Sequence, residues 1–126
     1  MDAPGDDIED GLSVLGVTFH GPDAYVLTLR GITGPGDSGV LEEAFARATV
    51  AARPLIVDLG ALEFGDESLL GILLHARLSH RTVLVGPLSA SFSRRLAVTG
   101  TTTVFTIHPT LTQALAGITA LPGTDT

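Results

Sequence analysis

The sequence lacks cysteine, tryptophan and lysine, and aromatic residues make up only 5% of its 126 residues. Without cysteine there is no disulfide, no cysteine-ligated metal, no iron–sulfur cluster and no thiol catalysis. With so few aromatic residues, the core must be built from leucine, valine, isoleucine and alanine. The hydrophobic fraction of 44% is nevertheless too high for a disordered chain, and the length suits one domain.

Acidic residues exceed basic ones, which gives a net charge of −7, but their distribution is uneven. Five of the 14 acidic residues lie within the first ten positions, whereas residues 11–124 hold eight acidic residues against seven arginines. No basic stripe with interleaved aromatic residues is present, so binding to nucleic acid through its phosphates is not expected. The absence of lysine also argues against a polybasic membrane anchor.

Long hydrophobic runs are absent as well. The apolar run at residues 69–74 is far too short to span a bilayer, and residues 96–124, although uncharged, contain Gly100, Pro109 and nine threonines. The first residues lack the basic and apolar regions of a signal peptide. We therefore expect no membrane insertion and a cytoplasmic protein. Abundant Ala, Gly, Arg and Leu without lysine suggest a GC-rich bacterial genome.

The chain divides into one domain with two short terminal segments. Residues 1–11 combine Pro, Gly and dense acidic charge, which predicts a disordered tail, residues 12–120 form the domain, and residues 121–126 are a flexible end. Within the domain, residues 12–19 and 24–30 alternate in polarity around a turn at Gly21-Pro22-Asp23, which predicts a β-hairpin.

After the hairpin, helical and strand patterns alternate along the chain. Short apolar runs predict strands at residues 55–57, 82–85 and 104–107. Apolar residues at helical spacing, with Asp37 or Ser38, Asp66 and Ser89 as N-caps, predict helices over residues 38–51, 66–79, 89–99 and 111–120. This alternation predicts an α/β fold with a mainly parallel sheet and an antiparallel edge supplied by the hairpin.

Several candidate sites for catalysis or ligand binding carry weak signals. The histidines are His20, His75, His80 and His108, and the two on one helix are five residues apart and so do not share a face, which argues against a metal pair. The glycine-rich segment 31–36 fits no phosphate-binding pattern. The carboxylates Asp58, Glu63, Asp66 and Glu67 gather near one loop, but they can equally serve as caps and solvated charges. We expect no enzyme, no cofactor and no metal.

The segment 55–79 is more informative. On a helical wheel, Leu69, Leu70, Leu73, Leu74 and Leu78 form a broad buried face that also contains Arg77, while Ser68, Ile72, His75 and Ser79 share the opposite, exposed face. A phosphate on Ser68 would lie near the positive end of the helix dipole, and it would add negative charge to a surface where a partner can dock. Ser68 can also be an ordinary polar residue beside the Asp66 cap.

This segment resembles the STAS domain of the anti-sigma factor antagonists. The resemblance is carried by Phe64-Gly65-Asp66-Glu67-Ser68-Leu69-Leu70-Gly71 and extends over roughly residues 12–118, but only this central motif is specific. It implies a mixed sheet with about four helices packed mainly on one face.

The resemblance also implies a function. In the family, the second hydroxyl residue after the motif Asp accepts a phosphate, which places the phosphosite on Ser68, flanked by Asp66 and Glu67. A serine kinase that is also the anti-sigma factor phosphorylates this residue and binds the unmodified domain, and a cognate phosphatase is a further implied partner. The expected docking surface comprises the loop 62–66 and the exposed face of the helix, with Leu62, Phe64, Gly65, Ser68, Ile72 and His75.

Three departures from the family pattern leave alternatives open. Glu67 stands at the first hydroxyl position, Leu69 replaces a glycine, and Gly31-Ile32-Thr33-Gly34 lacks the acidic residues that often flank the phosphosite. The alternative is a phosphorylation-independent STAS scaffold subunit of a stress-signalling or transporter assembly. Nucleotide binding would require the segment 31–36 to hold phosphate. Other hydroxyls at predicted helix starts or in loops also compete with Ser68, namely Ser38, Ser89, Ser91, Ser93 and Thr101 to Thr103.

Overall fold

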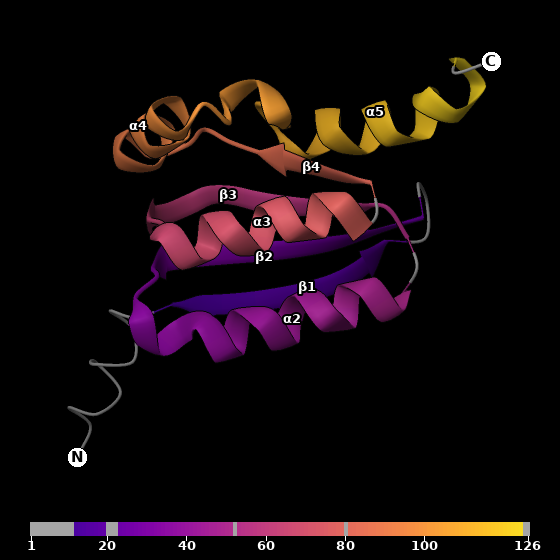
Figure 1. Cartoon of the computed structure of the whole chain (residues 1–126). Coiled ribbons are helices and arrows are strands. Elements are labelled where there is room, and N and C mark those ends of the chain that lie inside the picture. Colours follow the sequence, from indigo (N-terminus) through magenta and orange to yellow (C-terminus); the bar gives the residue numbers. More distant parts are fainter. Residues whose placement is uncertain (1–11, 20–22, 52, 80, 125–126) are drawn as a thin grey trace.

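The computed structural model describes residues 12–19, 23–51, 53–79 and 81–124 (Figure 1). The predicted acidic tail, the tip of the hairpin turn, His20 and His80 lie outside these residues. The strands are β1 (Ser13–Phe19), β2 (Ala24–Ile32), β3 (Leu55–Phe64), β4 (Thr82–Val85) and β5 (Thr106–His108). The α-helices are α2 (Ser38–Ala51), α3 (Glu67–Ser79), α4 (Ala90–Thr99) and α5 (Leu111–Thr124), and the short 3-10 helices are η1 (Pro35–Asp37) and η2 (Thr102–Val104).

The five strands form one mixed sheet in the order β1-β2-β3-β4-β5. β1 pairs antiparallel with β2, and the remaining pairs are parallel, as the sequence predicts. The strand order runs in a single direction, and right-handed crossovers then place the three connecting helices on the same face. α2, α3 and α4 cover this face, whereas α5 follows the last strand and covers the other (Figure 1).

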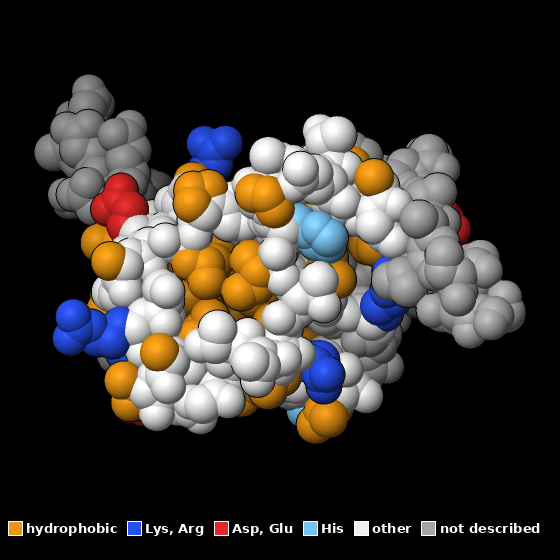
Figure 2. Space-filling model, turned by 90° about the horizontal axis from the view of Figure 1, so that it is seen from above, with side chains coloured by type: hydrophobic (Ala, Val, Ile, Leu, Met, Phe, Trp, Pro, Cys, Tyr) orange, Lys and Arg blue, Asp and Glu red, His pale blue; other side chains and the backbone are white. Residues whose placement is uncertain are grey.

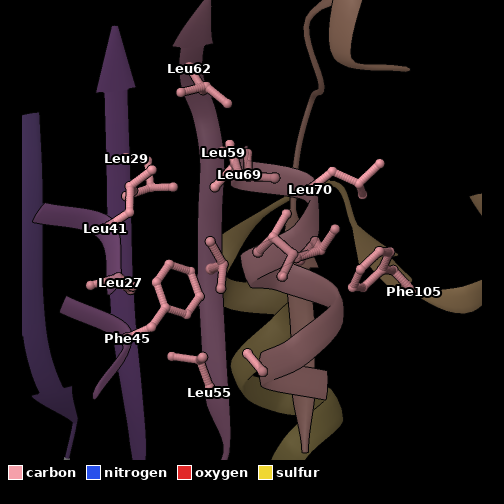
Figure 3. Close-up of a cluster of buried hydrophobic side chains, with 14 of the residues drawn as sticks. Leu27, Leu29, Leu41, Phe45, Leu55, Leu59, Leu62, Leu69, Leu70 and Phe105 are labelled. Carbon is pink, nitrogen blue, oxygen red and sulfur yellow. The ribbon is translucent and has the colours of Figure 1, made fainter. Parts of the chain in front are cut away.

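The larger core lies between the sheet and the three connecting helices (Figure 3). Alternate residues of β3, namely Leu55, Val57 and Leu59, point into it, while Ile56 points to the opposite face under α5. This alternation follows from the two-residue period of a strand. Leucines predominate in this core, as expected for a chain with few aromatic residues, and those drawn in Figure 3 include Leu27, Leu29, Leu41, Leu62, Leu69 and Leu70.

The ends of α4 agree with the sequence prediction. The Ser89 side chain accepts a hydrogen bond from the backbone N–H of Phe92, as an N-cap does. At the other end, Gly100 adopts a left-handed conformation (φ 73°), which terminates the helix. The start of α2 differs from the prediction, because the 3-10 helix η1 directly precedes it. The Asp37 carboxylate accepts a hydrogen bond from the Gly34 N–H at 2.8 Å, at the start of η1.

Some predicted boundaries were wrong. β3 continues to Phe64, because β2 continues to Ile32 alongside it and supplies its backbone hydrogen-bond partners. Residues 62–64, predicted to form a loop, therefore belong to a strand, and only Gly65 and Asp66 separate β3 from α3. β5 begins at Thr106 because Val104 ends η2. α5 continues to Thr124, beyond the predicted end.

The buried face of α3 also differs from the prediction in the last turn of the helix, where Arg77, predicted to lie on that face, is exposed. Leu69, Leu70 and Leu73 are buried and Leu74 is half-buried, but Leu78 is 81% exposed, and Ala76, which was not predicted to be buried, lies in the core. Leu78 lies in the last turn of α3, at the margin of the predicted face. Within the described residues, no helix is long and apolar enough to cross a membrane.

Candidate functional site

The start of α3 is built around Asp66, at the edge of the sheet where β2 and β3 end. The Asp66 carboxylate accepts a hydrogen bond from the Leu69 N–H at 3.1 Å, and the Asp66 backbone carbonyl accepts one from the Leu70 N–H at 3.2 Å. Asp66 is therefore the N-cap of α3, as the sequence predicts, and Glu67 and Ser68 occupy the first two helical positions. An acidic cap also suits the positive end of the helix dipole.

Thr33 holds this cap in place and was not identified from the sequence. Its backbone N–H donates to the Phe64 carbonyl at 2.9 Å. Its hydroxyl accepts from the Asp66 N–H at 2.8 Å and lies 3.1 Å from the Asp66 carboxylate, to which it donates. The side chain is 1% exposed. A single threonine after β2 thus fixes both the backbone and the carboxylate of the residue that starts α3.

α4 supplies a second contact to the same turn. Arg95 donates from Nε to the Gly65 carbonyl at 3.2 Å, and its guanidinium lies 3.8 Å from the Glu67 carboxylate. The guanidinium also lies 6.0 Å from the centre of the Phe64 ring, at the outer limit of a cation–π contact. Gly65 is buried, and a Cβ built there would lie 2.7 Å from the Phe92 ring, so this turn has no room for a side chain.

Ser68 is exposed at the second position of α3 and lies on the rim of a groove between α2 and α3. The groove has a volume of about 980 Å³. Its α3 wall is formed by Ser68, Gly71, Ile72, His75 and Ala76. Its α2 wall is formed by Ser38, Glu42, Phe45, Ala46, Thr49 and Val50. Three residues predicted to share an exposed face, Ser68, Ile72 and His75, therefore lie together in one depression.

The other predicted partner-binding residues do not join this groove. Leu62 is 4% exposed and belongs to the core, and Gly65 is buried, so neither presents a side chain to a partner. Phe64 is 38% exposed, but it lines a second groove beside α4 together with Glu67. Leu69, one of the departures from the family pattern, is fully buried, so this departure changes the core and not the surface around Ser68.

The contribution of α2 to the groove was not predicted, because the predicted exposed face lies on α3 alone. One signal in the sequence points to it, because Ala46 and Val50 are apolar residues outside the predicted buried positions of their helix. That α2 lies next to α3 follows from the strand order together with the right-handed crossovers. Val50 is 83% exposed and adds apolar surface to the α2 wall of the groove. The groove therefore has apolar walls on both helices.

The glycine-rich segment 31–36 has a structural role in the described residues. Thr33 is bonded to Phe64 and Asp66, and the Gly34 N–H donates to the Asp37 carboxylate. A carboxylate already occupies the position that an anion would need at Gly34, which argues against a phosphate-binding loop. Among residues 12–19, 23–51, 53–79 and 81–124, no group of three His, Asp or Glu side chains could hold a metal ion.

No family model matches the sequence, and no curated protein matches it. Solved structures do match. An anti-sigma factor antagonist from Mycobacterium paratuberculosis superposes with a TM-score of 0.74 and 24% identity, over 86% of this chain and 95% of that one. The chain has the STAS fold.

Two structures of the anti-sigma factor antagonist SpoIIAA agree with this assignment. The unphosphorylated form has a TM-score of 0.69 at 18% identity, over 84% of this chain and 96% of that one. The phosphorylated form of SpoIIAA, described as a Bacillus cell fate determinant, has a TM-score of 0.66 at 16% identity, over 84% of this chain and 99% of that one. The predicted fold class, a STAS-like mixed sheet with an antiparallel hairpin at its edge, is confirmed.

Proposed function

We propose that this STAS domain is a regulatory binding protein whose α2–α3 groove docks a serine kinase that acts as an anti-sigma factor, and that phosphorylation of Ser68 weakens the docking. The observation that carries the proposal is the position of Ser68 on the rim of the groove. The structural similarity to anti-sigma factor antagonists supports the general role. SpoIIAA exists in unphosphorylated and phosphorylated forms, which supports a phosphate switch on this fold.

The groove suits a protein partner. Phe45 and Ala76 form a buried apolar base, each 6% exposed, while Val50 and half-buried Ile72 stand higher on the two walls. Polar side chains line the remainder of the groove, including Glu42 and Ser68. An apolar centre with a polar rim is the usual anatomy of a protein–protein interface. Gly71 has no atom within 4 Å of an added Cβ, so a partner backbone can approach α3 closely there.

The charge around Ser68 explains how a phosphate would act. A phosphate on Ser68 would add up to about two negative charges to a groove that already contains Glu42, and it would follow Glu67 directly in the chain. A phosphate at the second position of α3 would not disrupt the helix, because the helix dipole and the first backbone N–H groups stabilise an anion there. The domain would therefore stay folded while a partner that buries Ser68 meets repulsion and a desolvation cost.

A phosphorylation-independent scaffold is the second candidate, and Glu67 is the observation that favours it. The Glu67 side chain is 90% exposed and places a permanent negative charge beside Ser68. If the partner already tolerates this charge, a further charge on Ser68 would change its binding little. The two candidates differ in one measurable property, the effect of charge at position 68.

The test is capture of partners from a lysate of the source organism, with mass spectrometry of the captured proteins. Wild type is expected to capture an ATP-binding serine kinase that Ser68→Asp loses. Ser91→Asp is the matched control, because Ser91 is also exposed at the second position of a helix, α4. Equal capture by wild type and Ser68→Asp would favour the scaffold.

A second pair of variants tests the groove itself. Val50 lies in the groove and is 83% exposed, whereas Leu78 is 81% exposed and lies outside it. Val50→Glu is expected to reduce capture of the kinase, and Leu78→Glu is expected to leave it unchanged. Because both side chains are exposed, neither change should unfold the domain. Equal effects of the two variants would contradict docking in the α2–α3 groove.

A further inference from the structure

The charges of this chain are divided sharply along the sequence. Residues 1–67 contain 13 acidic residues and three arginines, whereas residues 68–124 contain four arginines and no acidic residue. The second part forms α3, β4, α4, β5 and α5, and the sheet order places the last four of these on one side of the molecule. Seen from that side, blue side chains lie around the surface and red ones only at its margins (Figure 2).

A groove of about 650 Å³ lies where this basic part meets the end of β3. Phe64 and Val98 provide apolar surface, 38% and 78% exposed, and Arg94 and Arg95 of α4 provide the positive charge. Glu67 is the acidic residue among those that line it. We call this depression the α4 groove, to distinguish it from the α2–α3 groove.

The two arginines of the α4 groove differ in their engagement. Arg95 is bonded to the Gly65 carbonyl and lies close to Glu67, so it has a structural role. Arg94 is exposed, and within the described residues it makes no hydrogen bond or ion pair. A positive charge beside exposed apolar side chains is suited to an acidic, partly apolar segment.

Residues 1–11 have this chemistry. The segment carries Asp2, Asp6, Asp7, Glu9 and Asp10, together with the apolar Ile8. It leads directly into Leu12, which packs against the larger core on the face covered by α2, α3 and α4. Ser13 pairs with Arg30, near the carboxyl end of β2, so β1 starts at the end of the sheet where the α4 groove opens (Figure 1).

The segment is long enough to reach the groove. Two strand spacings of about 4.8 Å separate β1 from β3, which is roughly 10 Å across the sheet. Ser13 pairs with Arg30, and Arg30 pairs with Ala61, so Ser13 and Ala61 lie at the same level of the sheet. From Ala61, β3 continues for three residues to Phe64, which adds roughly 10 Å along the strand. Eleven extended residues span about 35 Å.

We propose that the acidic segment 1–11 binds the α4 groove of its own chain, with its carboxylates on Arg94 and Ile8 against Phe64 and Val98. The connection to β1 keeps the segment near the groove, so weak exposed ion pairs suffice to populate the bound state. The bound segment would lie beside Glu67 and would therefore border the rim on which Ser68 stands. The α4 groove is separate from the α2–α3 groove, so this binding does not require the partner proposed above.

A spin label tests this binding directly, because the absence of cysteine allows one to be introduced at a single site. The full chain with Ala3→Cys and a nitroxide label is measured by NMR, and amide signal intensities are compared before and after chemical reduction of the label. The expected result is loss of the signals of residues 90–99 in the oxidised sample. The loss should disappear in 1 M salt, where the screening length is about 3 Å.

Two variants locate the interaction. Arg94→Gln in the labelled chain is expected to restore the signals of α4, whereas Arg47→Gln, which removes an exposed positive charge from α2, should not. Unchanged α4 signals in the labelled wild type would overturn the proposal, and so would equal effects of the two variants. Signal loss only when labelled chain is mixed with separate isotope-labelled chain would assign the groove to a second copy and would also overturn it.

Discussion

Replacement of Thr33 by valine is the most informative test of how the start of α3 is held. Valine has nearly the same shape as threonine, so the change removes the hydroxyl and leaves no cavity. The Asp66 N–H loses its acceptor at 2.8 Å, and the Asp66 carboxylate loses a donor at 3.1 Å but keeps the Leu69 N–H. An unsatisfied donor costs about 1–3 kcal/mol, and a hydrogen bond to a charged group is worth about 1.5–3 kcal/mol.

Asp66 is only half-buried, so water replaces part of what is lost. We therefore expect the free energy of unfolding to fall by about 2 kcal/mol, near the middle of the range for a buried donor. For a domain of this size such a fall lowers Tm by roughly 8 °C. The assay is urea unfolding followed by circular dichroism, with hydrogen exchange of the Asp66 amide as a local measure, which should become faster.

Thr33→Ser is the control. Serine keeps the hydroxyl and loses one methyl group, which costs about 0.8 kcal/mol. If the hydroxyl matters as the geometry indicates, Thr33→Ser should be more stable than Thr33→Val, and its Asp66 amide should exchange as slowly as in wild type. A valine variant as stable as wild type, or less destabilised than the serine variant, would refute the reasoning.

Three further changes test the packing around the two grooves, each by urea unfolding. Leu69→Ala removes a fully buried side chain and should cost about 3 kcal/mol; a loss below 1 kcal/mol would contradict its place in the core. Gly71→Ala should stabilise the protein by about 1 kcal/mol, because the position is helical and open, and destabilisation would show an unrecognised contact. Gly100→Ala should destabilise by about 1 kcal/mol, because φ is 73° there, and an unchanged stability would be inconsistent with that conformation.

Much of this fold could be predicted from local signals in the sequence. The hairpin, the buried strand at Leu55 and the caps Asp66, Ser89 and Gly100 each depend on a few adjacent residues, and the structure contains all of them. The extension of β3 to Phe64 could not be predicted in the same way. It depends on β2 lying alongside, and a polar segment with Asp58, Gly60 and Glu63 has no strand pattern of its own.

The candidate site was predictable where it lies on one helix and not where it joins separate segments. The shared face of Ser68, Ile72 and His75 follows from the helical period alone. Thr33, which supports Asp66 from 33 residues away, lies in a segment whose glycines suggest only a turn. The wall formed by α2 became visible only when the order of the strands fixed which helices are neighbours.

The most direct test of the central claim is the affinity of the captured kinase for the protein before and after phosphorylation, measured by titration calorimetry, with the modified residue located by mass spectrometry. The account predicts phosphate on Ser68, no modification of Ser68→Ala, and a loss of affinity of at least about tenfold in the phosphorylated form. Phosphate on another hydroxyl, or equal affinity of the two forms, would contradict a switch at Ser68 on the α2–α3 groove.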